Sequence, residues 1–208
     1  MASINDILER RKLGCTYRNG TWEHDMLQSV RVGGDDLVVS VSKSEFRDAM
    51  ACVCASVNIV TTDGTAGRGG FTATAMSSVS DEPPLLLVCM KRSSAQSQLF
   101  VENGCFCVNV LTGQQTELAG YFAGGLKDME ARYTAAAWTQ LVTGSPVLNH
   151  ALINFDCKLD AVHVAGTHNI MIGRVVAVQQ QPEMSALVYF ERAYLELTKG
   201  KPARVLPR

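Results

Sequence analysis

Short runs rich in valine, isoleucine and threonine recur between residues 57 and 190, and they favour a mainly β fold. Residues 57–62 are largely β-branched and end at Asp63-Gly64, a turn pair typical of hairpins. Residues 85–90 form a continuous apolar run, which predicts a strand buried on both faces. Further strands are predicted over residues 71–78, 105–111, 170–178 and 187–190. Many strands with few helices indicate a β-barrel or sandwich with helical decoration.

One more strand is predicted from strict alternation. Apolar and polar residues alternate from Ile153 to Ala161, as in a strand with one buried face. The alternation shifts at Val162 and Val164, where we expect a β-bulge.

The helices have recognisable starts and stops. Residues 42–45 read Ser-Lys-Ser-Glu, a capping box that predicts a helix over 43–54. Its apolar residues recur at helical spacing, so we expect that stripe to face a core. A helix over 93–103 closes near Gly104, and one over 114–122 is stopped by Gly124-Gly125. The stripe of the first helix consists of Phe46, Ala49, Met50 and Val53.

Length and charge narrow the class of protein. The chain has 208 residues, 47% of them hydrophobic and 19% charged, enough for one domain with a sizeable core. A net charge of −1 argues against nucleic-acid binding or a membrane surface held by charge. No apolar run approaches the roughly 20 residues of a membrane span, so we expect a cytoplasmic protein. We expect residues 1–43 to be an N-terminal extension, 44–200 the functional domain and 201–208 a tail.

Seven cysteines lie at positions 15, 52, 54, 89, 105, 107 and 157, without a CxxC motif or zinc-ligand spacing. We therefore predict no metal site and interpret the cysteines as buried, reduced thiols. A redox thiol is the alternative, although nothing nearby in the sequence would stabilise a thiolate.

Motifs for several large enzyme classes are missing. No GxGxxG opens a helix, and the sequence holds no GK[ST], GxSxG or HExxH motif. An enzyme with this sequence would therefore be neither a Rossmann dehydrogenase, a P-loop NTPase, an α/β-hydrolase nor a zincin.

Four segments could carry a site. In residues 70–78, small side chains would let a flat ligand approach the backbone, although threonine's β propensity alone also explains them. Residues 91–94, Lys-Arg-Ser-Ser, suit a phosphate at a helix start, or are simply a solvated cap. His168 lies between two strands, where it could contact a substrate or be an ordinary surface histidine. Residues 189–194 offer aromatic rings and an arginine to a dinucleotide, or form a strand edge and exposed tail.

A set of short segments occurs together and in order. The segments are Phe46-Arg-Asp-Ala-Met50, residues 57–64, Ala66-Gly-Arg68, Gly70-Phe-Thr-Ala-Thr-Ala75, Ser78-Val-Ser80, Pro83-Pro84, Leu87-Val-Cys89, Cys107-Val-Asn-Val-Leu111 and Gly166-Thr-His168. This ordered set strongly resembles the short-chain flavin reductases of two-component flavin monooxygenases, of the HpaC and RutF types. HpaC is the reductase component of 4-hydroxyphenylacetate 3-monooxygenase. The resemblance covers residues 44–197.

The resemblance implies a six-stranded Greek-key split β-barrel in a homodimer. It implies reduction of FMN or FAD by NADH or NADPH, through hydride transfer to flavin N5. Diffusible reduced flavin would then serve a partner monooxygenase. Two alternatives stay open: a flavin-dependent reductase of a corrinoid, cob(II)yrinic acid a,c-diamide, on the same fold, and a non-catalytic flavin-binding module.

The resemblance also assigns candidate residues. His168 and Gly166 match the family's G-[DT]-H motif for nicotinamide binding, with His168 more a contact than an obligatory acid. Arg192 and Tyr194 fall near the same pocket. The flavin-binding candidates are Asn58, Thr72, Ala73, Thr74, Ala75, Ser77, Ser78, Lys91, Arg92, Ser93, Ser94, Ser97 and Asn109.

Overall fold

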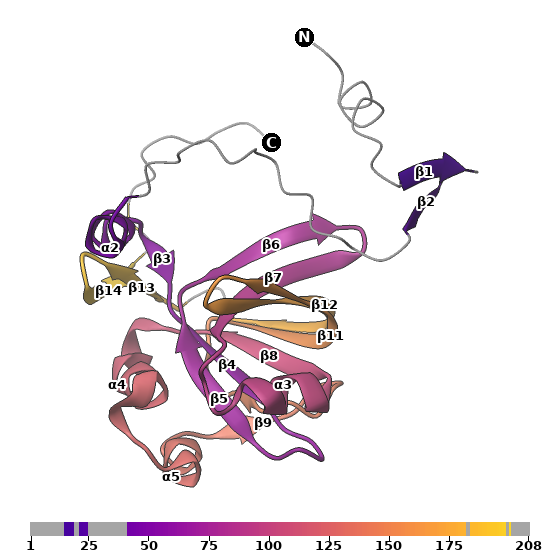
Figure 1. The fold of residues 1–208 in the computed structure, drawn as a ribbon. Coiled ribbons are helices and arrows are strands. Elements are labelled where there is room, and N and C mark those ends of the chain that lie inside the picture. Colours follow the sequence, from indigo (N-terminus) through magenta and orange to yellow (C-terminus); the bar gives the residue numbers. More distant parts are fainter. Residues whose placement is uncertain (1–14, 19–20, 25–40, 182–183, 199, 201–208) are drawn as a thin grey trace. The chain divides into compact units, whose positions relative to one another are not determined.

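The computed structural model describes residues 15–18, 21–24, 41–181, 184–198 and 200. Contacts divide the chain into two units, Met1–Val41 and Ser42–Arg208. In the first unit, β1 (Cys15–Arg18) and β2 (Thr21–His24) pair as an antiparallel hairpin. The second unit holds the segments predicted to carry function (Figure 1).

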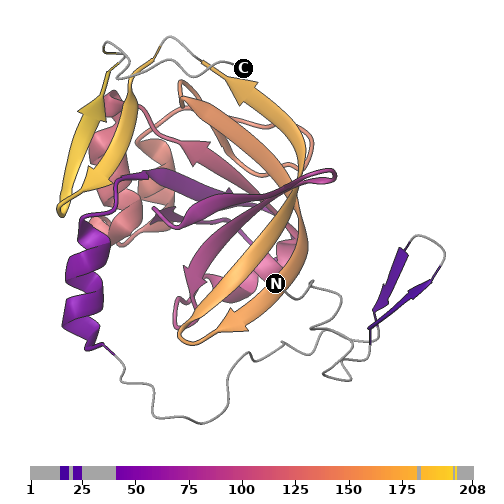
Figure 2. The same cartoon turned by 90° about the horizontal axis from the view of Figure 1, so that it is seen from above.

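The second unit is built on one curled antiparallel sheet of seven strands in the order β5-β4-β8-β11-β12-β7-β6. Its two edge strands, β5 and β6, follow one another in the chain and are separated only by Thr74 and Ala75. Figure 2 shows how the sheet curls around its own interior. Counted as one strand broken at this point, β5 and β6 give the six strands predicted, and the mainly β split-barrel fold is confirmed. The strands are β4 (Asn58–Thr62), β5 (Gly69–Ala73), β6 (Met76–Asp81), β7 (Pro84–Lys91), β8 (Cys105–Val110), β11 (Ile153–Ala165) and β12 (His168–Gln180).

Smaller elements cover one end of this sheet. A three-stranded sheet has the order β14-β13-β3, and β9 pairs with β10. The strands are β3 (Ala55–Ser56), β9 (Trp138–Thr139), β10 (Val147–Leu148), β13 (Ala186–Phe190) and β14 (Ala193–Leu197). The helices are α2 (Lys43–Ala51), α3 (Ser97–Asn103), α4 (Thr116–Gly120) and α5 (Met129–Thr134), with a 3-10 turn η1 (Gly113–Gln115) and a π-helical turn η2 (Tyr121–Gly125). No helix in the described ranges is long and apolar enough to cross a membrane.

Two apolar clusters hold these layers together. The first fills the curled sheet, where Val60, Phe106 and Met171 are almost fully buried. The second joins the sheet to α4, η2 and β13 through residues such as Phe122 and Leu187. Burial of these side chains supplies the main driving force for the fold.

Several predictions about local structure are confirmed. Ser42 caps α2 with both bonds of the capping box, and Gly104 ends α3 in the left-handed conformation. Gly124, with φ 108°, ends the helical segment that follows β8. The alternating strand predicted from Ile153 is β11.

Other predictions about strands are wrong. Residues 71–78 do not form one strand, because the chain breaks at Thr74 and Ala75. β7 buries only alternate residues, since it belongs to an antiparallel sheet with one face toward the core. The bulges in β11 come earlier than predicted, between Asp156 and Cys157 and between Leu159 and Ala161. The exposed tail considered as an alternative for residues 189–194 is instead the β13–β14 hairpin.

The predicted orientation of the first helix is also wrong. Phe46, Met50 and Val53 are 58%, 50% and 52% exposed, so the apolar stripe of α2 does not pack on a core within the described chain. α3 begins at Ser97, so residues 93 and 94 do not cap it. Cys52 and Cys54 are exposed rather than buried, because they follow the end of α2.

The buried cysteines do behave as small apolar residues. Cys105, Cys107 and Cys157 are buried and unpaired. Burial, with a smaller contribution from the nearby Asp156 carboxylate, raises the pKa of Cys157 to about 12. Burial also raises the pKa of Cys107, so Cys107 and Cys157 stay protonated at neutral pH.

Asp156 shows why the polar positions of β11 are buried. Its Oδ2 accepts hydrogen bonds from the backbone N–H groups of Val142 and Thr143, at 2.7 and 2.8 Å. The carboxylate therefore fixes the loop that follows β9 onto the sheet, a role that alternation in the sequence does not reveal.

We predict that Gly173→Ala destabilises the fold. A Cβ at this position would lie 2.9 Å from the Cβ of Cys157 and would collide with the ring of Phe106. The free energy of unfolding should fall by about 1–3 kcal/mol in urea titrations. Gly120→Ala is the matched control, since no atom lies within 4 Å of its added Cβ. Equal stabilities of the two variants would contradict this account of the core.

Candidate functional site

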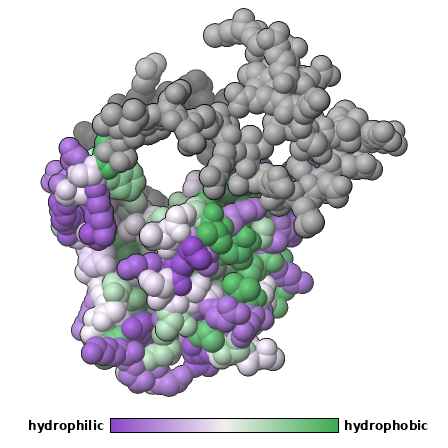
Figure 3. All heavy atoms as spheres, in the orientation of Figure 1, coloured by the Kyte–Doolittle hydropathy of each residue, from purple (hydrophilic) through white to green (hydrophobic). Residues whose placement is uncertain are grey.

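The break between β5 and β6 opens into a cavity of about 960 Å³, here called the strand-break cavity. Its lining comes from four places: α2, β3, the break itself and the β13–β14 hairpin. One wall is formed at the break by Thr74, Ala75 and Met76. Another wall comes from the β13–β14 hairpin, near the end of the domain, and includes Tyr189 and Arg192. In Figure 3, apolar side chains adjoin the polar ones of α2. The cavity thus brings segments from both ends of the domain together.

The break leaves backbone donors without partners. The N–H of Met76 donates to the carbonyl of Thr74 at 3.0 Å, and that of Cys89 donates to the carbonyl of Ala75 at 3.1 Å. The N–H groups of Thr74 and Ala75 themselves donate to no described residue. Both residues are exposed and small, so a ligand could reach these donors without passing bulky side chains.

Asn58 fixes the position of the break. This residue is fully buried, and its Nδ2 donates to the carbonyls of Ser56 and Ala73, each at 3.1 Å. It therefore joins the end of β3 to the end of β5. Its Oδ1 is buried and has no partner within the described residues. Buried acceptors are rarely left unsatisfied, so this atom fits a ligand donor or a bound water.

A second group of predicted residues meets at the far end of β7, here called the basic turn cluster. The Arg92 N–H donates to the carbonyl of Thr167 at 3.0 Å, and His168 lies opposite Lys91 in the β12–β7 ladder. Asn169 donates to the hydroxyl of Ser97 at 3.1 Å. The cluster comprises Lys91, Arg92, Ser93, Ser94, Ser97, Gly166 and His168.

The turn between β11 and β12 explains how His168 is presented. Gly166 is the first residue of a two-residue turn and has a φ of 56°. A residue with a side chain would adopt this left-handed conformation only with strain. The hydroxyl of Thr167 lies 3.0 Å from Nδ1 of His168 and orients the exposed ring. His168 therefore stands beside two cations with its Nε2 edge available.

β7 connects the cavity and the cluster. The N–H of Cys89 donates a hydrogen bond to the carbonyl of Ala75 at the break, and Lys91 is two residues further along β7. That separation is about 7 Å at the ordinary rise of a strand. The two groups of residues therefore lie within the reach of one nucleotide-sized ligand.

Comparison with known proteins identifies the family of this chain. A family model described as "Flavin reductase like domain" matches residues 50–198. This chain belongs to the flavin reductase family.

Flavin reductase relatives match most of the chain. Proteins named FMN reductase (NADH) RutF from Pantoea ananatis and Stutzerimonas stutzeri are 47% and 49% identical over 160 residues, covering 77% of this chain and 84% and 91% of theirs. A putative flavin reductase structure from Haemophilus somnus is 45% identical, with a TM-score of 0.73, and covers 76% of this chain and all of its own. The flavin reductase HpaC complexed with NADP+ is 27% identical, with a TM-score of 0.68, over 75% of this chain and 98% of its own.

Not every candidate residue lines the strand-break cavity or belongs to the basic turn cluster. Asn109 is fully buried, and its Oδ1 accepts from the N–H of Leu148 and the Nδ2 of Asn154, both at 2.8 Å. Its Nδ2 donates to the carbonyl of Ile59 at 2.9 Å. The side chain has no polar atom left for a ligand and instead joins three strands of the core.

Other candidates lie near the site without lining it. The Thr72 hydroxyl donates to the carbonyl of Ala119 at 2.6 Å and anchors β5 to α4, while Ala73 is buried. Ser77 and Ser78 are exposed on β6, outside the cavity lining. Tyr194 supports the wall by packing edge-on against Tyr189, with 5.6 Å between ring centroids.

The sequence reasoning missed the contribution of α2. Ser44, Arg47, Asp48 and Ala51 line the cavity at spacings of three, one and three residues. These residues form a second stripe along α2, beside the apolar one. Because the stripe is mostly polar, helical periodicity in the sequence indicated a solvent-facing surface there.

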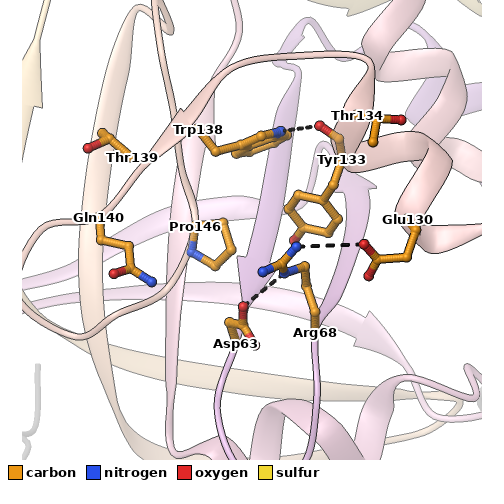
Figure 4. Close-up of a pocket in the computed structure, with 9 residues that line it drawn as sticks. All are labelled: Asp63, Arg68, Glu130, Tyr133, Thr134, Trp138, Thr139, Gln140 and Pro146. Carbon is orange, nitrogen blue, oxygen red and sulfur yellow. Dashed lines mark hydrogen bonds and ion pairs between the residues drawn. The ribbon is translucent and has the colours of Figure 1, made fainter.

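A second cavity, of about 540 Å³, lies beside Tyr133 and Trp138 (Figure 4). Three of its polar side chains already have partners: the Arg68 guanidinium donates to the Asp63 carboxylate at 2.8 Å and lies over the ring of Tyr133, whose hydroxyl donates to the carbonyl of Gly69. Burial raises the pKa of Tyr133. The hydrogen bond to Asp63 raises the pKa of Arg68. These three side chains hold this part of the fold together.

Proposed function

We propose that this protein catalyses the reduction of FMN or FAD by NADH or NADPH and releases reduced flavin to a partner monooxygenase in the cytoplasm. The observation that carries the proposal is the strand break, where two unpaired N–H donors face an open cavity and the orphan acceptor of Asn58 is buried next to the break. The relatives named FMN reductase (NADH) support the choice of flavin and coenzyme.

The residues present fit a flavin. A flavin ring carries acceptors and an N–H along one polar edge, and when bound it accepts the hydride. The N–H groups of Thr74 and Ala75 would donate to those acceptors, and Asn58 Oδ1 would accept from the N–H. Backbone donors fixed by the sheet also stabilise negative charge that develops on a ligand, without reorganisation.

The cations and serines of the basic turn cluster fit the phosphate end of the same ligand. Lys91 and Arg92 supply charge, and the hydroxyls of Ser93, Ser94 and Ser97 supply neutral donors. Because these residues are largely exposed, the flavin can exchange with solution. Exchange is what a reductase that supplies a separate monooxygenase requires.

Gly166, His168, Arg192 and Tyr194 would hold the nicotinamide coenzyme. Hydride transfer requires the two rings within about 3–3.5 Å of each other, so these residues act by positioning. His168 contributes a contact rather than a proton, since the transfer needs no side-chain base.

We also propose that the protein is a homodimer. The exposed stripe formed by Phe46, Met50 and Val53 is a helix face without an apolar partner in the described chain, and burial of such a face is favourable. Because Met50 and Val53 also line the strand-break cavity, the partner would close the cavity on one side. Sedimentation velocity should give about twice the chain mass of 22.5 kDa, whereas a monomer at micromolar concentration would refute the dimer.

The first test mixes the purified protein anaerobically with NADH or NADPH and with FMN or FAD. We expect the absorbance of both coenzyme and flavin to fall only when protein and flavin are both present. A corrinoid reductase would in addition reduce cob(II)yrinic acid a,c-diamide above the background from free reduced flavin. Tight flavin binding without coenzyme oxidation would refute the proposal and favour a binding module.

Two substitutions should separate the sites. Ala75→Leu should weaken FMN binding about tenfold or more, because its added bulk covers the backbone donors of the break. His168→Ala should leave FMN binding unchanged and raise the KM for NADH, because it removes a coenzyme contact. Fluorescence titration of FMN and steady-state kinetics measure the two effects. An unchanged KM and kcat for NADH in His168→Ala would remove His168 from the coenzyme site.

A further inference from the structure

The strand-break cavity carries charge only on the side formed by α2 and the β13–β14 turn. Arg47 and Asp48 come from α2, and Arg192 comes from the turn. Among the described residues, no other lysine, arginine, aspartate or glutamate lines the cavity. An anionic ligand in this cavity would therefore meet these three side chains.

Asp48 and Arg192 form an ion pair between α2 and the β13–β14 turn. Nη2 of Arg192 donates to Oδ1 of Asp48, whereas Oδ2 of Asp48 accepts no hydrogen bond from the described residues. Arg47 has no acidic partner within the described part of the chain. Asp48 thus neutralises the charge of Arg192, whereas the charge of Arg47 is not compensated by any acidic side chain among the described residues.

The turn that carries Arg192 is held in an unfavourable conformation. Glu191 and Arg192 have φ values of 48° and 62°, in the left-handed region that side-chain residues rarely adopt. The N–H of Glu191 donates to the carbonyl of Ala51 at 2.7 Å, which fixes the turn to the end of α2. Both φ values are those of the type I′ turn that joins two strands through two residues.

The ion pair itself does little for stability. The Arg192 and Asp48 side chains are 60% and 66% exposed, and exposed pairs contribute little to the free energy of folding. The pair is therefore better explained by what it presents to the cavity than by what it adds to the fold.

We propose that Asp48 is a specificity-determining residue that makes this site prefer NADH to NADPH; the inference rests on the reductase function proposed above. The two coenzymes share a diphosphate. Arg47 can bind it, together with the N–H groups of Arg192 that do not contact Asp48. NADPH adds a 2′-phosphate of about −1.5 to −2 charges at neutral pH. The Asp48 carboxylate repels that group and already occupies the cation that could neutralise it.

Asp48 also offers NADH a favourable contact. Its unoccupied Oδ2 can accept a hydrogen bond from the ribose 2′-hydroxyl, as acidic residues do at dinucleotide sites of other folds. Discrimination thus has an attractive and a repulsive component on one side chain.

The decisive variant is Asp48→Asn, which keeps the size of the side chain and removes its charge. With FMN saturating, kcat/KM is measured for NADH and for NADPH. We expect the NADH:NADPH ratio to fall about tenfold, mainly through a lower KM for NADPH. Asp48→Glu should retain most of the preference.

Asp63→Asn is the matched control. Asp63 pairs with Arg68 at 2.8 Å in the second cavity, so its loss also frees an arginine but away from the proposed coenzyme site. The NADH:NADPH ratio should not move in this variant. Thermal melting checks that each variant is folded, and Asp48→Ser replaces Asp48→Asn if that protein does not fold.

Three outcomes would overturn the inference. They are a wild-type preference for NADPH, an unchanged ratio in Asp48→Asn, and an equal loss with both coenzymes, which would make Asp48 only a positioning residue for Arg192. All three leave flavin reduction itself intact. Absence of flavin-dependent oxidation of either coenzyme by the wild-type protein would instead refute the proposed function and this inference together.

Discussion

The amide of Asn58 is the contact on which the site depends. Its Nδ2 donates to the carbonyls of Ser56 and Ala73. These two hydrogen bonds hold the end of β3 against the end of β5, directly before the break. Because Asn58 is fully buried, this bridge is shielded from water and is stronger than an exposed hydrogen bond would be. The unpaired N–H groups of Thr74 and Ala75 are presented at a fixed place for this reason.

The walls of the strand-break cavity belong to two different sheets. The strand break and β7 belong to the curled sheet, whose interior is filled by side chains such as Val88 and Phe106. The hairpin wall is held by the pairing of β13 with β3, by the buried Leu187 and by the bond from the Glu191 N–H to the carbonyl of Ala51. The donors proposed for the flavin lie on the curled sheet, as do Gly166 and His168, whereas Arg192 lies on the hairpin. Packed elements of the fold therefore position both sets of groups.

The sequence predicted the fold better than the orientation of its parts. Periodicity, turn pairs and the capping box located most strands and α2, because these signals depend on local backbone preferences. The break at Thr74 and Ala75 was missed, since nothing in a run of alternating threonine and alanine marks where pairing changes from β4 to β7. Asn109 was taken for a ligand contact, yet it satisfies core donors and acceptors on neighbouring strands.

Sequence alone determined that this chain forms a mainly β domain, and its ordered motifs placed it in the flavin reductase family. Those properties follow from local propensity and from residue identity at matching positions. Only the tertiary structure decided that Arg47 and Asp48 share a cavity with Arg192, that the stripe of α2 is uncovered, and that Asn109 belongs to the core. These facts depend on contacts between residues as much as 144 positions apart, and periodicity along a chain carries no information about such distant partners.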